Sequence, residues 1–329
     1  MIEKGKMNDK RSFMKKIVIT GSSGYLGRSL LSKLDQTEWC SHFYGIDIEP
    51  PLSKYSKGEW HSFDINDTAL SDWMPTIEPD ILIHLAFVVN PMKDHRKQRM
   101  INIEGTKNIL NAAQKAGVKQ ILVASSATAY GAWPDNPIPL KETDPIRGHH
   151  SFQYAQEKFE QEGICQAFIR NNPDTLLSII RPCVVYGPGV NNYLSALLSM
   201  PVGLALWRHN PRVQFIHEED VVRAILTILE KKGKGAYNLA PIDTMPIHDV
   251  LSLTQKPKLL LPDSLLSMVL SIYWSASFLP FYNIPPSFID FIRYPWIVDS
   301  SRLQRELGFE FTYSSYETIM IMLKSKGII

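Results

Sequence analysis

Three glycines recur at every third position between an apolar run and a helical pattern near the start of the chain. Gly21-Ser-Ser-Gly24-Tyr-Leu-Gly27 follows the strand-like Ile17–Ile19 and leads into the helix-like Leu26–Leu34. Glycines here let the backbone turn tightly and approach a pyrophosphate, whose charge meets the N–H groups and positive end of the helix. This strand–turn–helix setting predicts a dinucleotide-binding βαβ unit. The residues expected to contact the dinucleotide are Gly21, Gly24, Tyr25, Leu26 and Gly27.

The first half of the chain alternates strand-like and helix-like segments. Helical patterns such as Met100–Ala116 and Tyr154–Arg170 separate β-rich runs at Lys16–Thr20, Phe43–Ile48, Ile81–Phe87, Ile121–Ser125 and Leu177–Arg181. Continuous apolar strands joined by helices predict an α/β fold, a Rossmann-type doubly wound parallel sheet with helices on both faces. Ligands of such sheets bind beyond the carboxyl ends of the strands.

The rhythm changes after about Gly187. Turn residues lead into mixed segments, then a helix-like Glu219–Lys231, a strand-like Tyr237–Ala240 and a proline-rich, aromatic remainder. We expect residues 1–13 to form a flexible N-terminal extension and residues 14–187 to form the NAD-binding Rossmann domain. Residues 188–329 are expected to form mainly a smaller, substrate-binding C-terminal lobe, with segments that return to the Rossmann domain.

Composition and charge exclude several classes of protein. With 44% hydrophobic and 21% charged residues the chain is globular, and its formal charge of +2 comes from the basic segment Met1–Lys16. The remainder carries slightly more acidic than basic residues, so charge gives no reason to expect a nucleic-acid partner. Cys40, Cys165 and Cys183 are too few and too widely spaced for a disulfide framework. With no secretory signal either, a reducing, cytoplasmic location is expected.

The stretch 264–289 is the least charged part of the chain. Its longest run without proline, Ser264–Leu279, is shorter than the roughly 20 residues that span a bilayer core. Ser264, Ser267, Ser271 and Ser275 recur at helical spacing and leave the rest of the helix surface to apolar residues. We favour a buried or pocket-lining helix, with monotopic membrane contact through 264–289 as the alternative.

Two acidic residues at strand ends suit the adenosine half of a dinucleotide. Asp47 ends the second strand about 20 residues after the glycine loop, where a carboxylate accepts both ribose hydroxyls and repels a 2′-phosphate. NAD is therefore expected in preference to NADP. Asp64, after the third strand, is suited to receive an adenine amino group, and Ile65 beside it is expected to contact the cofactor.

A tyrosine and a lysine lie four residues apart on a predicted helix, which places Tyr154 and Lys158 on one face. Tyrosine has a pKa near 10, so work as a base near pH 7 needs a pKa shift of about three units. The Lys158 ammonium and a positive nicotinamide ring together supply that shift. Ser126 follows the β-rich strand that precedes this helix in the chain, where its hydroxyl would hydrogen-bond a substrate oxygen. The three residues predict proton and hydride transfer at an alcohol carbon.

Further motifs follow in order along the chain: His84-Leu85-Ala86, Asn102-Ile-Glu-Gly105-Thr, Ser125-Ser126-Ala-Thr-Ala-Tyr-Gly131, Tyr154-Ala-Gln-Glu-Lys158, Arg181-Pro-Cys-Val-Val-Tyr-Gly-Pro188, Asp299-Ser-Ser-Arg302 and Glu306-Leu-Gly308. With the glycine loop, this series resembles the extended short-chain dehydrogenases/reductases, the NAD-dependent epimerase/dehydratase group. The resemblance implies a Ser126–Tyr154–Lys158 triad steadied by Asn102. It also implies that the nicotinamide half of NAD is lined by Leu85, Ala86, Pro182 and Cys183.

Some positions depart from the family pattern. Glu157 replaces a small residue and is expected to face away from the tyrosine. Ala127 and Thr128 stand where 4,6-dehydratases carry an acidic pair, so elimination of water is not expected. Arg212 lies one position before the usual place of an arginine that grips a sugar nucleotide's diphosphate, and Arg293 is a second phosphate-binding candidate.

Histidines do not predict a metal site, because the nine of them show no metal-ligand spacing. His149 and His150, in the loop before the tyrosine helix, are expected to be solvated. His217 and Asp220 look like structural positions of the family.

The expected function is NAD-dependent oxidation or reduction of a secondary alcohol or ketone, with a small molecule as substrate. Sugar nucleotides are the commonest substrates that the resemblance implies, so a sugar-nucleotide epimerase or reductase is the first hypothesis. The apolar 264–289 stretch and the shifted Arg212 favour an alternative, a dehydrogenase of a lipophilic, 3β-hydroxysteroid-like alcohol. A third hypothesis is a non-catalytic NAD-binding regulator, against which the intact triad argues. A homodimer is left open.

Overall fold

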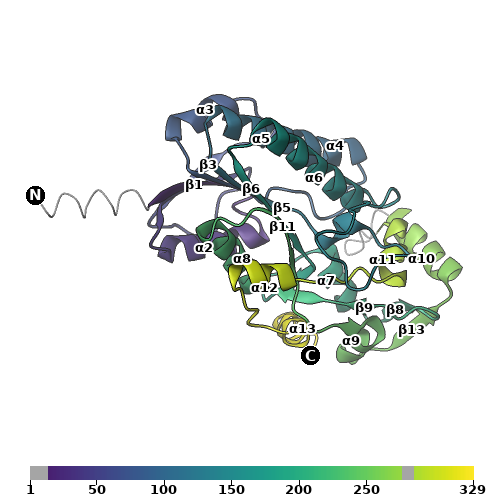
Figure 1. Cartoon of the computed structure of the whole chain (residues 1–329). Coiled ribbons are helices and arrows are strands. Elements are labelled where there is room, and N and C mark those ends of the chain that lie inside the picture. The colour runs from purple at the N-terminus through teal and green to yellow at the C-terminus, as the bar shows by residue number, and fades with distance from the viewer. Residues whose placement is uncertain (1–13, 276–284) are drawn as a thin grey trace, which may run out of the picture. The chain divides into compact units, whose positions relative to one another are not determined.

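The computed structural model describes residues 14–275 and 285–329 (Figure 1). Seven strands form one sheet in the order β11-β6-β5-β4-β1-β2-β3. The pairs β1–β2, β1–β4, β2–β3 and β4–β5 are parallel. These strands are β1 (Lys15–Thr20), β2 (Cys40–Asp47), β3 (Gly58–Ser62), β4 (Ile81–His84), β5 (Gln120–Ala124), β6 (Leu176–Pro182) and β11 (Gly235–Leu239). The predicted α/β, Rossmann-type fold is confirmed.

Helices and short strands make up the rest of the described chain. The helices are α2 (Tyr25–Gln36), α3 (Leu70–Ile77), α4 (His95–Arg99), a π-helix (Met100–Glu104), α5 (Gly105–Lys115), a 3₁₀ turn (Ala127–Tyr130), α6 (Gln153–Asn171), α7 (Tyr193–Ser199), α8 (Glu218–Glu230), α9 (Ile247–Leu253), α10 (Asp263–Ser275), a 3₁₀ turn (Pro286–Phe288), α11 (Ile289–Arg293), α12 (Ser301–Leu307) and α13 (Ser315–Ser325). The short strands are β7 (Val184–Tyr186), β8 (Gly203–Leu206), β9 (Arg212–Val213), β10 (Phe215–His217), β12 (Met245–Pro246) and β13 (Lys258–Leu261).

The chain divides into two compact units. In the described residues, the first contains 14–87, 100–124 and 164–178, and the second contains 88–99, 125–163, 179–275 and 285–329. The domains expected from sequence, 14–187 and 188–329, remain a prediction, and the expected extension 1–13 lies outside the described residues.

The first unit is built on strands that are apolar on both faces. Residues Ile17–Ile19 of β1 and all four residues of β4 are buried, as a strand covered on both sides requires. In Figure 1, α2 lies on one side of this part of the sheet and α3 and α5 lie on the other. Helix α2 buries Leu30, Leu31 and Leu34, and each such side chain contributes about 1.5–3 kcal/mol of burial free energy.

The second unit uses polar side chains to fix its helix ends. A ring nitrogen of His217 accepts the Glu219 N–H at the start of α8. The buried Asp220 carboxylate accepts the N–H groups of Thr312 and Tyr313 and pairs with Arg223. His217 and Asp220 therefore hold the fold together, as expected.

Helix α10 corrects the expectation of a fully buried helix, whereas the alternative of a pocket-lining helix remains a prediction. Leu266 and Leu270 are buried, but Leu265, Met268 and Ile272 are exposed. A sequence of serines and apolar residues without charges does not distinguish a helix buried all round from one that buries a single face. Residues 276–284 of the predicted 264–289 stretch lie outside the described residues.

Cys40, Cys165 and Cys183 are all buried free thiols. The described residues contain no group of three or more His, Cys, Asp or Glu side chains able to hold a metal ion. In the same part of the chain, no helix combines the length and hydropathy needed to cross a bilayer.

Candidate active site

The glycine loop joins β1 to α2 in the first unit, and its geometry requires glycine. Gly21 has φ +72°, and a Cβ atom there would lie 2.6 Å from the backbone nitrogen of Ala86 and 2.9 Å from the carbonyl carbon of Leu85. A Cβ on Gly27 would lie 2.2 Å from the Gly21 oxygen. The loop is therefore pressed against Leu85 and Ala86, two residues that sequence assigns to the same cofactor.

The start of α2 is suited to bind an anion. Gly24 is the N-cap and has no side chain to satisfy the first N–H groups of the helix, and the first turn, which begins with Tyr25 and Leu26, contains no acidic residue. Backbone N–H groups and the positive end of the helix dipole then face the loop. The glycines of the loop have no side chains in the way, so the loop and the first turn of α2 fit the pyrophosphate of a dinucleotide.

Asp47, the last residue of β2, lies beside this loop. Its Oδ2 accepts the Ser23 N–H at 2.9 Å, and its Oδ1 accepts the Glu49 N–H at 3.3 Å. These bonds fix the carboxylate at the carboxyl end of the strand, where a ribose is expected in this fold.

Asp64 and Ile65 follow β3. The exposed Asp64 accepts the Asn66 N–H at 2.9 Å and so closes a local turn. Ile65 is buried, and a Cβ on Gly105 would lie 2.5 Å from its Cδ1. The Ile65 side chain therefore packs on the start of α5, and its contact with the cofactor remains a prediction.

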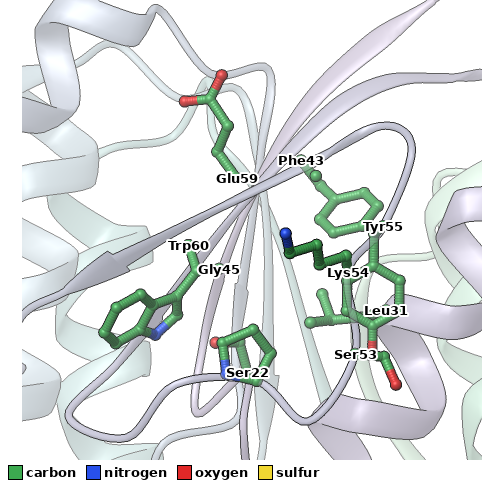
Figure 2. A pocket seen from close by; sticks show the side chains of 11 residues that line it. Ser22, Leu31, Phe43, Gly45, Ser53, Lys54, Tyr55, Glu59 and Trp60 are labelled. Atoms are coloured by element: carbon green, nitrogen blue, oxygen red, sulfur yellow. The ribbon is translucent and has the colours of Figure 1, made fainter.

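A cavity of about 220 Å³ borders the glycine loop, β2 and the segment that leads into β3 (Figure 2). The Ser22 hydroxyl lies at this cavity, is fully buried and has no hydrogen-bond partner among the residues that the structure describes. Lys54 and Trp60 line the other sides. The cavity could not be predicted from the sequence, because its lining comes from separate stretches between residues 22 and 60.

The second unit brings Ser126, Tyr154 and Lys158 together. Ser126 follows β5 in extended backbone, caps the 3₁₀ turn Ala127–Tyr130, and hydrogen-bonds the Tyr154 side chain. The Lys158 ammonium lies 5.9 Å from the centre of the tyrosine ring, one turn along α6. It is buried and donates a hydrogen bond of 3.0 Å to Gln161 Oε1.

Burial raises the pKa of Tyr154 to about 12, and the hydrogen bond to Ser126 acts in the opposite direction. The hydroxyl therefore holds its proton at neutral pH in this structure. To act as a base near pH 7, Tyr154 would need its pKa lowered by about five units. Nearby positive charge would have to stabilise the tyrosinate by about 7 kcal/mol, since each pKa unit corresponds to about 1.4 kcal/mol. A protonated Tyr154 is already suited to donate a proton to a carbonyl oxygen.

A buried ion pair supports the segment that carries Ser126. Glu162 on α6 accepts from the Arg181 guanidinium at 2.6 and 2.9 Å and from the Ser125 hydroxyl at 2.6 Å. The Arg181 guanidinium also donates to the Tyr130 hydroxyl at 2.7 Å, which itself lies 3.0 Å from Asn238 Oδ1. This network joins β6, α6 and the serine segment. The roles of Glu162 and Tyr130 in it were not apparent from the sequence.

Asn102 lies in the first unit, on the π-helix Met100–Glu104. It is fully buried, and its carbonyl oxygen accepts the Thr106 hydroxyl at 2.6 Å. Pi-helical turns place an extra residue in a helix and are frequent at functional sites. The proposed role of Asn102 beside the triad remains a prediction.

Pro182 ends β6 and Cys183 follows it in the second unit. The Cys183 N–H donates to the Leu239 oxygen at 3.0 Å, and burial raises the pKa of the thiol well above its usual value. The thiol is therefore neutral, and its contact with nicotinamide remains a prediction.

Both candidate phosphate-binding arginines are engaged within the second unit. Arg293 donates to Asp263 at 2.9 Å and to Asp290 at 2.5 Å. Arg212 is exposed, and its guanidinium donates to the Thr244 hydroxyl and carbonyl oxygens.

The expectation that His149 is solvated is wrong, whereas His150 is exposed. The His149 ring stacks on Trp133 at 4.7 Å between centres, and its Nε2 lies 3.4 Å from an Asp290 oxygen. Burial lowers the pKa of His149. A loop position alone does not reveal an aromatic partner from an earlier part of the chain.

Glu157 is nearly fully buried on α6. Its two oxygens accept the side-chain amides of Gln98 at 3.0 Å and Gln153 at 2.7 Å. The residue thus links α4 to α6.

A sequence profile described as the NAD dependent epimerase/dehydratase family matches residues 17–240. An uncharacterized protein of Mycobacterium tuberculosis is 20% identical over 96% of this chain and 85% of its own length. A Candida albicans sterol-4-alpha-carboxylate 3-dehydrogenase is 29% identical over 54% of this chain and 52% of its own. A Vibrio cholerae UDP-glucose 4-epimerase is 26% identical over 60% of each chain.

Solved structures share the fold over the same length. MoeE5, in complex with UDP-glucuronic acid and NAD, superposes with a TM-score of 0.73 at 20% identity, over 95% of this chain and 99% of its own. A Bacillus cereus UDP-glucuronic acid 4-epimerase in complex with NAD gives the same TM-score and coverage at 19% identity.

Proposed function

Since this chain belongs to the NAD-dependent epimerase/dehydratase family, we propose that it interconverts a secondary alcohol and a ketone by hydride transfer. The observation that carries the proposal is the grouping of Ser126, Tyr154 and Lys158 in the second unit. A regulator that only binds NAD would need the glycine loop but not these three side chains.

In the proposed oxidation, Tyr154 reacts as the tyrosinate, and its Oη accepts the substrate's hydroxyl proton while the C–O bond becomes a carbonyl. Bound NAD would supply the acceptor for the hydride that leaves the carbinol carbon. Ser126 holds the substrate oxygen during the transfer, and the Lys158 ammonium stabilises the tyrosinate. An epimerase returns the hydride to the opposite face of the ketone, whereas a dehydrogenase releases the ketone.

Sugar nucleotides are the first substrate class that we propose, because the Vibrio cholerae relative is named for one. Ala127 and Thr128 supply no acid for elimination, so we do not propose a dehydratase. A lipophilic alcohol is the second candidate, and the pairing of Arg293 with two carboxylates favours it. Two phosphate charges left without donors in a partly buried site would cost several kcal/mol.

NAD is expected to bind at least tenfold more tightly than NADP, because the Asp47 carboxylate accepts ribose hydroxyls and repels a 2′-phosphate. A tenfold ratio corresponds to about 1.4 kcal/mol. Isothermal titration of both dinucleotides measures it, and Asp47→Asn, which keeps the size of the side chain and removes its charge, should narrow the ratio. Equal affinities in the unmodified protein would contradict the role of Asp47.

Thermal stabilisation of the NAD-loaded protein separates the two substrate classes. If Arg293 stays with Asp263 and Asp290, sterols and other lipophilic alcohols should raise the melting temperature more than UDP, GDP or dTDP do. Strong stabilisation by a nucleoside diphosphate that is lost in Arg293→Ala or Arg212→Ala would instead establish a sugar-nucleotide substrate.

A further inference from the structure

Helix α10 presents an uncharged, partly apolar stripe to solvent. Leu265, Met268 and Ile272 are 38%, 53% and 60% exposed, and they recur at the spacing of one helix face. Serines 264, 271 and 275 fill the rest of that face, while Leu266 and Leu270 pack inward. The outer face of a helix in water ordinarily carries charges, yet no Asp, Glu, Lys or Arg occurs from residue 264 to 289.

Two adjoining pieces of chain add large apolar side chains. Leu259 and Leu260 of β13, just before α10, are 48% and 41% exposed. Trp207 is 64% exposed. Its backbone N–H donates to the Leu261 carbonyl oxygen at 2.9 Å, which connects it to the end of β13. We call these six residues the apolar patch: Trp207, Leu259, Leu260, Leu265, Met268 and Ile272. Exposed apolar groups on neighbouring segments of a chain mark interaction surfaces.

Most of the charged residues next to the apolar patch in the chain are basic. Arg208 follows Trp207, and Lys256 and Lys258 precede Leu259. Asp263 is the one acidic residue in the stretch from 250 to 289 that lies beside the patch in sequence, and it already pairs with Arg293 at 2.9 Å. The apolar patch thus has more basic than acidic residues beside it in the chain, which complements a surface that is apolar inside and anionic outside.

We propose that the apolar patch docks on an anionic phospholipid bilayer. The α10 side chains and Trp207 enter the boundary between headgroups and acyl chains, where an indole ring is favoured, and the basic residues face the lipid phosphates. A second copy of the chain is a poorer occupant, because a two-fold interface would bring these basic residues toward one another. The proposal goes beyond the reaction and does not depend on it.

Sedimentation of the full-length protein with vesicles tests the proposal, with pure phosphatidylcholine compared against a three-to-one mixture of phosphatidylcholine and phosphatidylglycerol. We expect binding to the mixed, anionic vesicles and at least tenfold weaker partitioning of the Met268→Gln/Ile272→Gln variant. Ile138→Gln/Ile242→Gln is the matched control, since Ile138 and Ile242 are at least as exposed and lie in the same unit away from α10 in sequence. Lys256→Gln/Lys258→Gln should weaken binding to the anionic vesicles only.

Circular dichroism of the same variants measures whether they are folded, and light scattering measures their oligomeric state. All variants should keep the far-ultraviolet spectrum of the parent, because the changed side chains lie at the surface. The absence of binding to either vesicle, or equal binding of the α10 variant and its control, would overturn the proposal. A dimer that Met268→Gln/Ile272→Gln dissociates would overturn it in favour of a second copy of the chain.

Discussion

Tyr154→Phe is expected to lower turnover by about 100-fold or more while NAD binding stays as it is. The substitution removes the hydroxyl that exchanges a proton with the substrate and keeps the ring that fills the buried position on α6. Steady-state kinetics with a substrate found in the stabilisation screen measures turnover, and calorimetry measures NAD affinity.

Lys158→Met is the informative partner of this variant. It removes the ammonium 5.9 Å from the tyrosine ring, and the family resemblance implies that the same group holds the nicotinamide ribose. Both turnover and NAD affinity should therefore fall. Near-normal turnover of Tyr154→Phe on a genuine substrate would place the chemistry elsewhere in the molecule.

Arg181→Met is expected to lower the free energy of unfolding by about 3–5 kcal/mol, because it leaves the buried Glu162 carboxylate without its cation. Chemical denaturation followed by circular dichroism measures the loss. The double variant Arg181→Met/Glu162→Met should recover much of it, since apolar side chains of similar volume replace a buried ion pair at little cost.

A second ion pair on α6 supplies the control. Arg99 pairs with Glu160, but the Arg99 side chain is 51% exposed, so water screens the interaction. Arg99→Met should therefore cost no more than about 1 kcal/mol. Equal losses for Arg181→Met and Arg99→Met would show that burial does not govern the strength of the Glu162 pair.

Short-range patterns were sufficient to predict the sheet, the glycine loop and the serine–tyrosine–lysine group. Continuous apolar runs indicate strands that are buried on both faces. The glycine spacing 21–24–27 indicates a tight backbone loop, and the spacing 154–158 places two side chains on the same face of a helix. Ser126 and Tyr154 are hydrogen-bonded in the structure, as residues at the carboxyl edge of one parallel sheet can be, and their role in catalysis remains a prediction.

Partners far apart in the chain escaped prediction. Arg181 lies 19 residues from Glu162 and 51 from Tyr130, and Asn238 lies 108 residues from that tyrosine. The periodicity of a helix or a strand in the sequence does not indicate which distant residues will pair. The exposure of one face of α10 was not predicted for a different reason. An uncharged pattern of serine and leucine is compatible with contact to protein or to lipid.

The buried thiols can serve as chemical probes of local unfolding in this chain. Burial raises the pKa of Cys40 to about 11 and that of Cys183 well above its usual value, so neither forms the reactive thiolate while it stays covered. Cys40 belongs to the first unit and Cys183 to the second. Alkylation of each thiol, followed in time by mass spectrometry, would report how often its own unit opens, and whether the two units open together or separately.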